Sequence, residues 1–320
     1  MFTKMIVEQY KKMAYGRCDD TGDVFYFTAA DFSILDAKPF TFRASAGHML
    51  VGYLYSYPNP IPGRLIIFDH GMGAGHTAYT KEIEMLCRRG YLVLAYDHTG
   101  CMQSGGENTN GMAQSLRDLN DCLNAVKQDG RFDGYDISVM GHSWGGFSTL
   151  NIAALHPEIS HIVVLSGFVS VELLIGSYFD GLLKSCRKHI LALETEHNPD
   201  FVGYNAVETL KNSNVKALLI YSDDDKLCKK TPHYDALAAG LADKENVKLM
   251  LVSGKGHNPN YTADAVAYKD AFFAELTKKR KKKQFKTLAD KAAFVANYDW
   301  HRMTAQDTEV WAAIYEALEK

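Results

Sequence analysis

The sequence has no apolar run that approaches the roughly 18 residues a membrane-spanning helix needs. Residues 1–18 also lack the continuous apolar core of a secretory signal peptide. Six cysteines are scattered along 320 residues without a C-x-x-C pair, which favours reduced thiols. Together these absences predict a cytoplasmic protein without a membrane span.

A strong charge of one sign is missing as well. The 35 lysine and arginine residues nearly balance the 38 aspartate and glutamate residues, which leaves a formal net charge of −3. A charge so close to zero indicates neither a nucleic acid nor an anionic membrane as partner, so we expect a small-molecule substrate. The composition, 47% hydrophobic and 23% charged, is typical of globular proteins, and the length allows one large α/β domain or two ordinary ones. Nothing in it indicates an oligomeric state.

Short apolar runs that end in polar residues or glycine dominate the middle of the chain. They lie at 64–71, 91–100, 136–143, 161–167, 215–225 and 247–257. Such nearly continuous hydrophobicity is typical of parallel strands that are buried on both faces. Ahead of them, residues 24–35, 40–45 and 48–57 have the aromatic and β-branched enrichment of strands.

Segments with apolar residues at helical spacing separate these runs. They lie at 79–89, 114–128, 147–156, 234–242 and 262–276. The alternation predicts an α/β fold with a mostly parallel, doubly wound sheet and antiparallel strands at its leading edge. A short amphipathic helix is also expected at the N-terminus, with one face made by Met5, Ile6, Gln9 and Met13.

Two segments interrupt the alternation within what we expect to be a single domain, 1–320. Residues 168–212 hold no strand-like run and are predicted to form a small helical cap insertion. The basic run KKRKKK, 278–283, is predicted to be a solvated helix end or linker. It leads into an appended helical tail over about 277–320.

The stretch MGHSWGGF (140–147) places three glycines around Ser143, directly after an apolar run and before a helical segment. Residues 141–145 fit G-x-S-x-G, in which the serine occupies a strand-to-helix turn too sharp for larger residues at the two glycines. The hydroxyl then projects above the sheet at the helix N-terminus, where the helix dipole favours developing negative charge. Gly146 would let the helix approach the sheet. An ordinary glycine-rich turn is the alternative, but this context favours Ser143 as a nucleophile.

The glycine-rich stretch FDHGMGAGH (68–76) follows an earlier predicted strand and has two interpretations. One is a dinucleotide-binding G-x-G-x-x-G turn, but the third glycine would have to stand where His76 does. The other is an oxyanion loop in which the N–H group of Met72 faces the serine and the N–H group of Trp144 is the second donor. We favour the second interpretation.

A serine nucleophile needs a base, and the base needs a carboxylate that orients it. His257 follows the last apolar run in a glycine-rich loop, whereas His70, His98 and His142 belong to turn motifs, so we expect His257 to be the base. The acid should come from the three consecutive aspartates at 223–225. A metal site is the alternative for this cluster, but no second group of ligands with suitable spacing accompanies it.

With serine, aspartate and histidine in this order, the sequence resembles the α/β-hydrolase superfamily. Over about residues 40–276 it is similar to serine aminopeptidase-like and acyltransferase/esterase-like bacterial hydrolases. In those relatives the acid stands three residues after a small residue that ends its strand, and Ser222 to Asp225 reproduces that offset. The resemblance therefore implies a triad of Ser143, Asp225 and His257.

The resemblance implies a serine hydrolase that cleaves a carboxylic ester or a related acyl bond through an acyl-enzyme, with no cofactor and no metal. Aminopeptidases and thioesterases use the same triad, and an aminopeptidase would also need an acidic anchor, for which Glu172, Glu194 and Glu196 are available. A non-catalytic ligand-binding protein of this fold is the alternative from another class. Such proteins commonly lose part of the triad, which is complete here.

The substrate pocket is the least constrained part of the site. We expect it to be lined by His76, Phe168, Tyr178 and Phe179. The aromatic residues of the insertion could form an apolar lid, or they could only pack the insertion on the sheet. Residues 97–104, DHTGCMQS, depart from the D-x-R-G-x-G-x-S pattern of many relatives, so the pocket wall there is expected to differ.

Overall fold

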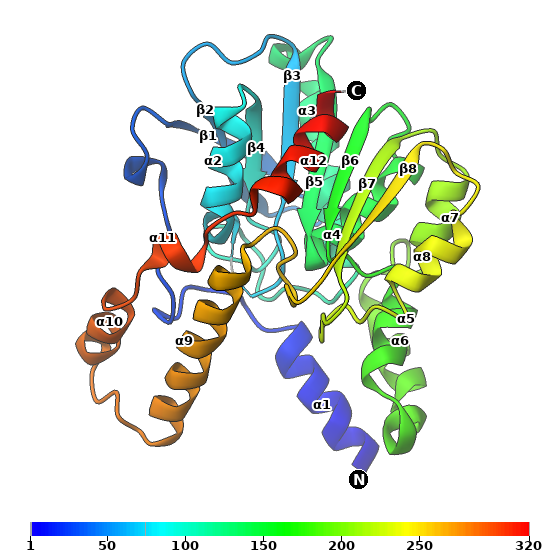
Figure 1. Ribbon diagram of the computed structural model, residues 1–320. Coiled ribbons are helices and arrows are strands. Elements are labelled where there is room, and N and C mark those ends of the chain that lie inside the picture. The colour runs from blue at the N-terminus through cyan, green and yellow to red at the C-terminus, as the bar shows by residue number, and fades with distance from the viewer. Residues whose placement is uncertain (1, 74, 320) are drawn as a thin grey trace.

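The computed structural model describes residues 2–73 and 75–319, and within them eight strands form one sheet. The strand order is β1-β2-β4-β3-β5-β6-β7-β8 (Figure 1). β2 is antiparallel to both β1 and β4, and the other neighbouring pairs are parallel. This confirms the predicted fold class. The strands are β1 (Asp36–Arg43), β2 (Met49–Ser56), β3 (Arg64–Asp69), β4 (Leu92–Tyr96), β5 (Asp136–His142), β6 (His161–Leu165), β7 (Lys216–Ser222) and β8 (Val247–Val252).

The first strand-like stretch of the sequence does not become a strand, so this part of the prediction is wrong. Residues 24–35 lie outside the sheet and contain the short 3₁₀ helix η1 (Ala29–Asp31). The backbone N–H and the hydroxyl of Thr28 donate to Oδ2 of Asp31, at 2.7 and 3.0 Å. Local bonds of this kind offer the backbone an alternative to strand pairing.

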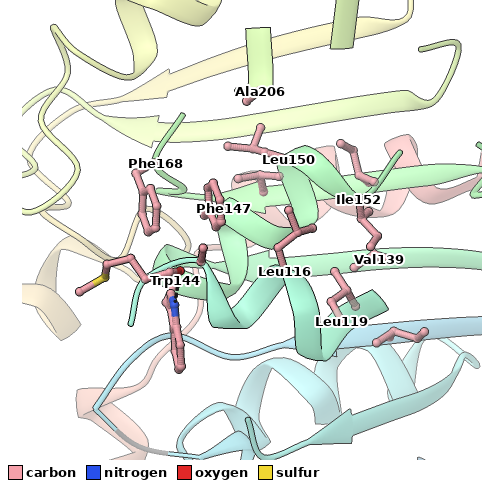
Figure 2. Packing of buried hydrophobic residues seen from close by; sticks show 14 of the residues in the cluster. Leu116, Leu119, Val139, Trp144, Phe147, Leu150, Ile152, Phe168 and Ala206 are labelled. Carbon is pink, nitrogen blue, oxygen red and sulfur yellow. Dashed lines mark hydrogen bonds between the residues drawn. The ribbon is translucent and has the colours of Figure 1, made fainter. Parts of the chain in front are cut away.

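Two layers of helices cover the sheet, as the alternation predicts. One face packs against α2 (Thr80–Arg88) and α12 (Thr308–Glu319), and the other against α3 (Gln114–Gln128), α4 (Ser143–Asn151), α7 (Ala206–Lys211) and α8 (Tyr234–Gly240). In the second layer, Leu116 of α3 and Leu150 of α4 pack with Val139 of β5 (Figure 2). Burial of these apolar side chains stabilises the layer by about 1.5–3 kcal/mol for each of them.

Between β6 and β7 the described chain forms helices and no strand. They are α5 (Val171–Tyr178), the 3₁₀ helix η5 (Gly181–Cys186), α6 (Arg187–His197) and α7. Together with α1 (Phe2–Ala14) and α9 (Ala263–Lys281), α5 and α6 extend beyond one end of the sheet (Figure 1). None of the described helices is long and apolar enough to cross a membrane.

Helix α1 lies where the amphipathic pattern predicts a helix, but it buries a different face. Tyr10 and Ala14 are buried, whereas Met5 and Met13 are 55% and 60% exposed. The Tyr10 hydroxyl donates to Oε1 of Glu194 at 2.6 Å, which joins α1 to α6. Ile6, which belongs to the predicted face, and Val7 also pack against the core, so apolar contacts and the bond to the buried carboxylate together fix the inward face of α1.

The C-terminal part of the chain differs from the expectation of an appended tail. We expected residues 262–276 to be the last helix of the core, but α9 packs Phe272 and Leu276 in a separate cluster with α10 (Leu288–Ala296) and α11 (Trp300–Met303). The last helix on the sheet is instead α12. The reason is that α12 has an apolar face that it buries against the sheet, made by Val310, Trp311, Ile314 and Leu318.

The basic run occupies the position that the sequence indicates. Residues 278–281 form the last turn of α9, and the helix cap follows at Lys282. Arg280 forms an ion pair with Asp23, and Lys279 with Glu275 at 3.6 Å. The run is therefore a helix end, and one of its charges ties α9 to the segment that precedes β1.

Candidate active site

Ser143 occupies the turn between β5 and α4 with φ of 54°, a left-handed conformation that is unfavourable for a residue with a Cβ atom. The neighbouring glycines are required by close contacts. A Cβ atom at Gly141 would overlap the carbonyl oxygen of Gly145, and one at Gly145 would overlap the backbone of Asp69. The turn therefore has the geometry that the G-x-S-x-G pattern predicts, with the serine held in a strained position.

Close packing behind the turn explains the third glycine. A Cβ atom at Gly146 would stand 2.7 Å from Cα of Gly167, so only glycine lets α4 approach the end of β6. Next to this contact, the rings of Phe147 and Phe168 stack with centroids 4.6 Å apart and planes 6° apart (Figure 2). Phe168, which we expected in the substrate pocket, is 3% exposed and belongs to this packing.

Three side chains that follow different strands meet at the turn. Oγ of Ser143 lies 2.7 Å from Nε2 of His257, and Nδ1 of His257 lies 2.8 Å from Oδ2 of Asp225. Asp225 follows β7 and His257 follows β8, so both come from the carboxyl ends of parallel strands, where such folds place their ligands. The structure thus brings the three predicted residues into one chain of hydrogen bonds.

Asp225 is held in its ionised form by its surroundings. Its Oδ1 accepts hydrogen bonds from the backbone N–H groups of Leu227 at 2.8 Å and Cys228 at 3.1 Å. Although burial opposes the charge, His257 and these N–H groups keep the pKa of Asp225 below its usual value. A buried, charged and fixed carboxylate is suited to orient an imidazole ring.

The two preceding aspartates bind the loop rather than the histidine. Asp223 accepts bonds from Ser253 and Gly254, at 2.8 and 3.0 Å, and lies on the surface. Asp224 accepts a bond from Gly256 at 2.8 Å. Both therefore shape the turn that carries His257, and neither contacts its ring.

Three side chains in this part of the site are close enough together to be considered as ligands of a metal ion. The side chains of Asp225, Cys228 and His257 place one ligand atom each within 4.8 Å of one another. However, both ring nitrogens of His257 already lie at hydrogen-bond distance from Asp225 and Ser143, at 2.8 and 2.7 Å. These side chains are therefore better suited to transfer a proton along a series of hydrogen bonds than to bind a metal ion.

His142 is a site residue that the sequence analysis assigned only to a turn. Its Nε2 lies 2.7 Å from the carbonyl oxygen of His257, so this nitrogen carries the proton and donates it. Its Nδ1 then accepts from the Tyr79 hydroxyl at 2.7 Å, and that oxygen accepts from the Gly71 N–H group at 3.1 Å. Burial and the neighbouring His257 lower the pKa of His142 to about 3, so the ring is neutral. This relay joins the loop after β3, the serine turn and the histidine loop.

A buried ionic cluster lies directly behind the serine turn. Nε2 of His98 lies 2.8 Å from Oδ1 of Asp69, and its Nδ1 lies 3.3 Å from Oδ2 of Asp118. Although burial opposes a charge on the ring, the two carboxylates raise the pKa of His98 to about 10. The His98 ring also contacts the indole of Trp144, with centroids 4.8 Å apart. We infer that an imidazolium between two carboxylates supports the backbone of the turn.

The His98 cluster leads to a pH prediction for stability. Because the ring is charged in the folded protein and loses its proton near pH 6.5 when unfolded, its contribution is full below about pH 6.5 and is lost towards about pH 10. The difference in free energy of unfolding between wild type and His98→Gln should therefore narrow between about pH 6 and about pH 9. Urea denaturation at both values measures it, and a constant difference would contradict a charged His98.

The Trp144 side chain does not face a substrate. Its Nε1 donates to the carbonyl oxygen of Met112 at 2.7 Å, and the residue is 1% exposed. The part of Trp144 that can still contribute to the site is therefore its backbone N–H group, at the start of α4.

A cavity of about 290 Å³ opens beside His257 and reaches Met72 in the loop after β3. Its other walls come from segments that the sequence analysis did not connect with the site. They are residues 24–26, Phe273 of α9, and Trp300, Met303 and Thr304 in and beside α11. No local sequence motif marks these residues. They come together as a wall of the cavity only when the segments before β1 and after β8 fold back beside the sheet.

The residues that we expected to line the pocket lie elsewhere. His76 is 1% exposed, with Nδ1 at 2.7 Å from Asp97 and Nε2 at 2.9 Å from Tyr55. Tyr178 is 42% exposed and its hydroxyl donates to the carbonyl oxygen of Leu227 at 3.0 Å. Phe179 packs against Tyr10 of α1. The cavity at His257 is walled by other residues, which come from the loops beside the serine turn, from α9 and from the segments 24–26 and 300–304.

Comparisons with known proteins agree with the fold. Residues 60–202 match the family described as serine aminopeptidase, S33. An esterase from Pyrococcus furiosus, Pf2001, superposes with a TM-score of 0.59 over 84% of this chain and 97% of its own, at 19% identity. The chain has the α/β-hydrolase fold. The segment that matches the family contains the serine turn and the loop after β3, and ends before β7.

Curated relatives match a shorter part of this chain. Monoglyceride lipase from Rattus norvegicus is 32% identical over 118 residues, which are 36% of this chain and 38% of the lipase. A putative carbamate hydrolase, RutD, from Rhizobium rhizogenes is 28% identical over 120 residues, 37% of this chain and 43% of that protein. The chain thus matches about two fifths of the length of these relatives, and their names indicate hydrolases.

Proposed function

We propose that this protein is a serine hydrolase that cleaves carboxylic esters through an acyl-enzyme intermediate. The observation that carries the proposal is the hydrogen-bonded series from Ser143 through His257 to Asp225, at 2.7 and 2.8 Å. A nucleophile, a base and an orienting acid in one line are the groups that acyl transfer needs.

In the proposed mechanism, His257 takes the proton from Ser143 as the serine oxygen attacks the ester carbonyl carbon. Asp225 holds the Nδ1–H tautomer and stabilises the imidazolium ion that forms. The N–H groups of Met72 and Trp144 stabilise the oxyanion, a contribution of roughly 10²–10³ in kcat for each such donor. His257 then returns the proton to the leaving alcohol, and water attacks the acyl-enzyme with His257 again as base.

The charges around the cavity support esters over aminoacyl peptides. An aminopeptidase needs a carboxylate to bind the substrate ammonium group. Glu194 is buried and bonded to Tyr10 and to the Met112 N–H group, whereas Glu172 and Glu196 are exposed on α5 and α6. The ionisable groups that line the cavity include Lys269 and no carboxylate among the described residues.

We also propose that residues 168–212 act as a cap and that the remaining described chain forms the core, with α9 to α11 as a second wall. The Tyr178 hydroxyl and the Ser177 carbonyl of α5 bond to Leu227 and Lys229 in the loop after Asp225. Leu227 lines the cavity, so a movement of α5 would reach the site through this loop.

Labelling with a fluorophosphonate and a panel of substrates tests the function. Wild-type protein should react with the probe and should hydrolyse short para-nitrophenyl esters faster than aminoacyl anilides and acyl thioesters. Folded wild-type protein that neither labels nor cleaves any ester would favour a non-catalytic binding protein. Anilides as the best substrates would favour an aminopeptidase.

A further inference from the structure

Lys269 of α9 lines the cavity and lies in contact with the histidine loop. Its ammonium group donates to Oδ1 of Asn258, the residue after His257, and stands 5.5 Å from the centroid of the Tyr261 ring. Burial lowers the pKa of Lys269 below its usual value. A partly buried ammonium group is therefore hydrogen-bonded to the residue that follows the proposed catalytic base.

No carboxylate of the described residues forms an ion pair with Lys269, whereas two basic residues at the C-terminal end of α9, Lys279 and Arg280, both have one. Two acidic side chains act on it without forming an ion pair: Glu82 through the interior and Asp270, the next residue of α9, which is exposed. Burial raises the pKa of Glu82, and its Oε1 is occupied by the amides of Asn260 and Gln306, at 3.0 and 3.2 Å. Glu82 thus compensates the lysine charge poorly.

An ammonium group that is removed from water without a counter-ion costs free energy, and an anion that binds beside it recovers part of this cost. This uncompensated positive charge decides which kind of ligand the site favours. A neutral hydroxyl or amide would leave the charge uncompensated, whereas a carboxylate would form a charge-assisted hydrogen bond with Lys269.

The rest of the cavity defines the size and polarity of the ligand. Its walls include Phe25, Tyr79, Phe273 and Trp300, and it ends at Met72 on the side of the loop after β3. A volume of about 290 Å³ is near the lower end of small-molecule sites. Such a space accepts a short apolar or aromatic body with one negative group.

We propose that the substrates of this site are small esters that carry a free carboxylate, and that Lys269 binds that carboxylate while His257 and Ser143 act on the ester. The inference rests on the proposed ester hydrolase function. Lys269 is then a specificity-determining residue, and the substrate carboxylate is the counter-ion of its ammonium group.

A matched pair of substrates tests the proposal. One is the mono-para-nitrophenyl ester of hexanedioic acid with its second carboxylate free, and the other carries a neutral carboxamide at that end. Wild type should prefer the acid by about 10- to 100-fold in kcat/KM, which is the range expected for a charged hydrogen bond. Lys269→Met should lose this preference, which is measured within the variant as the ratio of kcat/KM for the two esters. Lys281→Met, the same change at the exposed end of α9, is the control and should keep the preference.

A binding experiment separates this proposal from the function on which it rests. Calorimetry should show that wild type binds the monoamide of hexanedioic acid at least about tenfold more tightly than the diamide. Equal hydrolysis of both esters would overturn the role of Lys269 and leave the ester hydrolase intact. Absence of any hydrolysis, with selective binding of the acid, would overturn the function and retain the anion site. A preference for the acid that survives in Lys269→Met would place the anion elsewhere.

Discussion

Ser143→Ala is expected to lower kcat for ester hydrolysis by on the order of 10⁶-fold and to abolish fluorophosphonate labelling. The reason is that Oγ of Ser143 is the atom in line with Nε2 of His257, at 2.7 Å. Residual activity would come from bound water and the N–H groups of Met72 and Trp144. The change is measured by steady-state kinetics on a para-nitrophenyl ester.

The control for this substitution must separate chemistry from folding. Alanine keeps the Cβ atom at φ of 54°, so the strain in the turn and the thermal unfolding midpoint should change little. Ser33→Ala, at an exposed position outside the sheet, should keep full activity. If Ser143→Ala kept more than about a tenth of the wild-type kcat, the serine would not be the nucleophile.

Asp225→Asn is expected to lower kcat by on the order of 10⁴-fold with a much smaller effect on KM. The amide can still occupy the space of the carboxylate, but it presents a donor to Nδ1 and favours the wrong tautomer of His257. It also removes the negative charge that stabilises the imidazolium ion in the transition state. Activity measured on the same ester, with binding of a product acid as a check of the folded site, tests this expectation.

The two neighbouring aspartates provide matched controls for Asp225. Asp223→Asn and Asp224→Asn should each cost less than about tenfold in kcat, because their carboxylates bond the loop at Ser253, Gly254 and Gly256. A larger loss in either variant than in Asp225→Asn would reassign the acid of the site.

Much of the fold was predictable because its signals are local. Each central strand is a nearly continuous apolar run, and α3 begins and ends where its helical pattern does, at Gln114 and Gln128. The serine turn is equally local, since the glycines at 141 and 145 are required by contacts within the same strand, turn and helix or with the adjacent strand. The three proposed triad residues could be named from their places after strands.

Other features were not predictable, because they depend on which distant segments meet. The inward face of α1 is fixed in part by Glu194, far along the chain, and not by the methionines of α1. The choice of α12 over α9 as the last helix on the sheet depends on a complementary apolar face. Neither partner is visible in a window of neighbouring residues.

The sequence by itself determined the residues of the proposed chemistry: a strand-turn-helix with a serine two residues from a required glycine on each side, and a candidate acid and base after later strands. The tertiary structure alone decided the cavity, the relay through His142 and the position of Lys269. The physical reason is the distance along the chain over which each effect acts. Backbone sterics and hydrophobic periodicity act over a few residues. The walls and charges of a binding site are set by contacts between segments that hundreds of residues separate, such as residues 24–26 and Trp300.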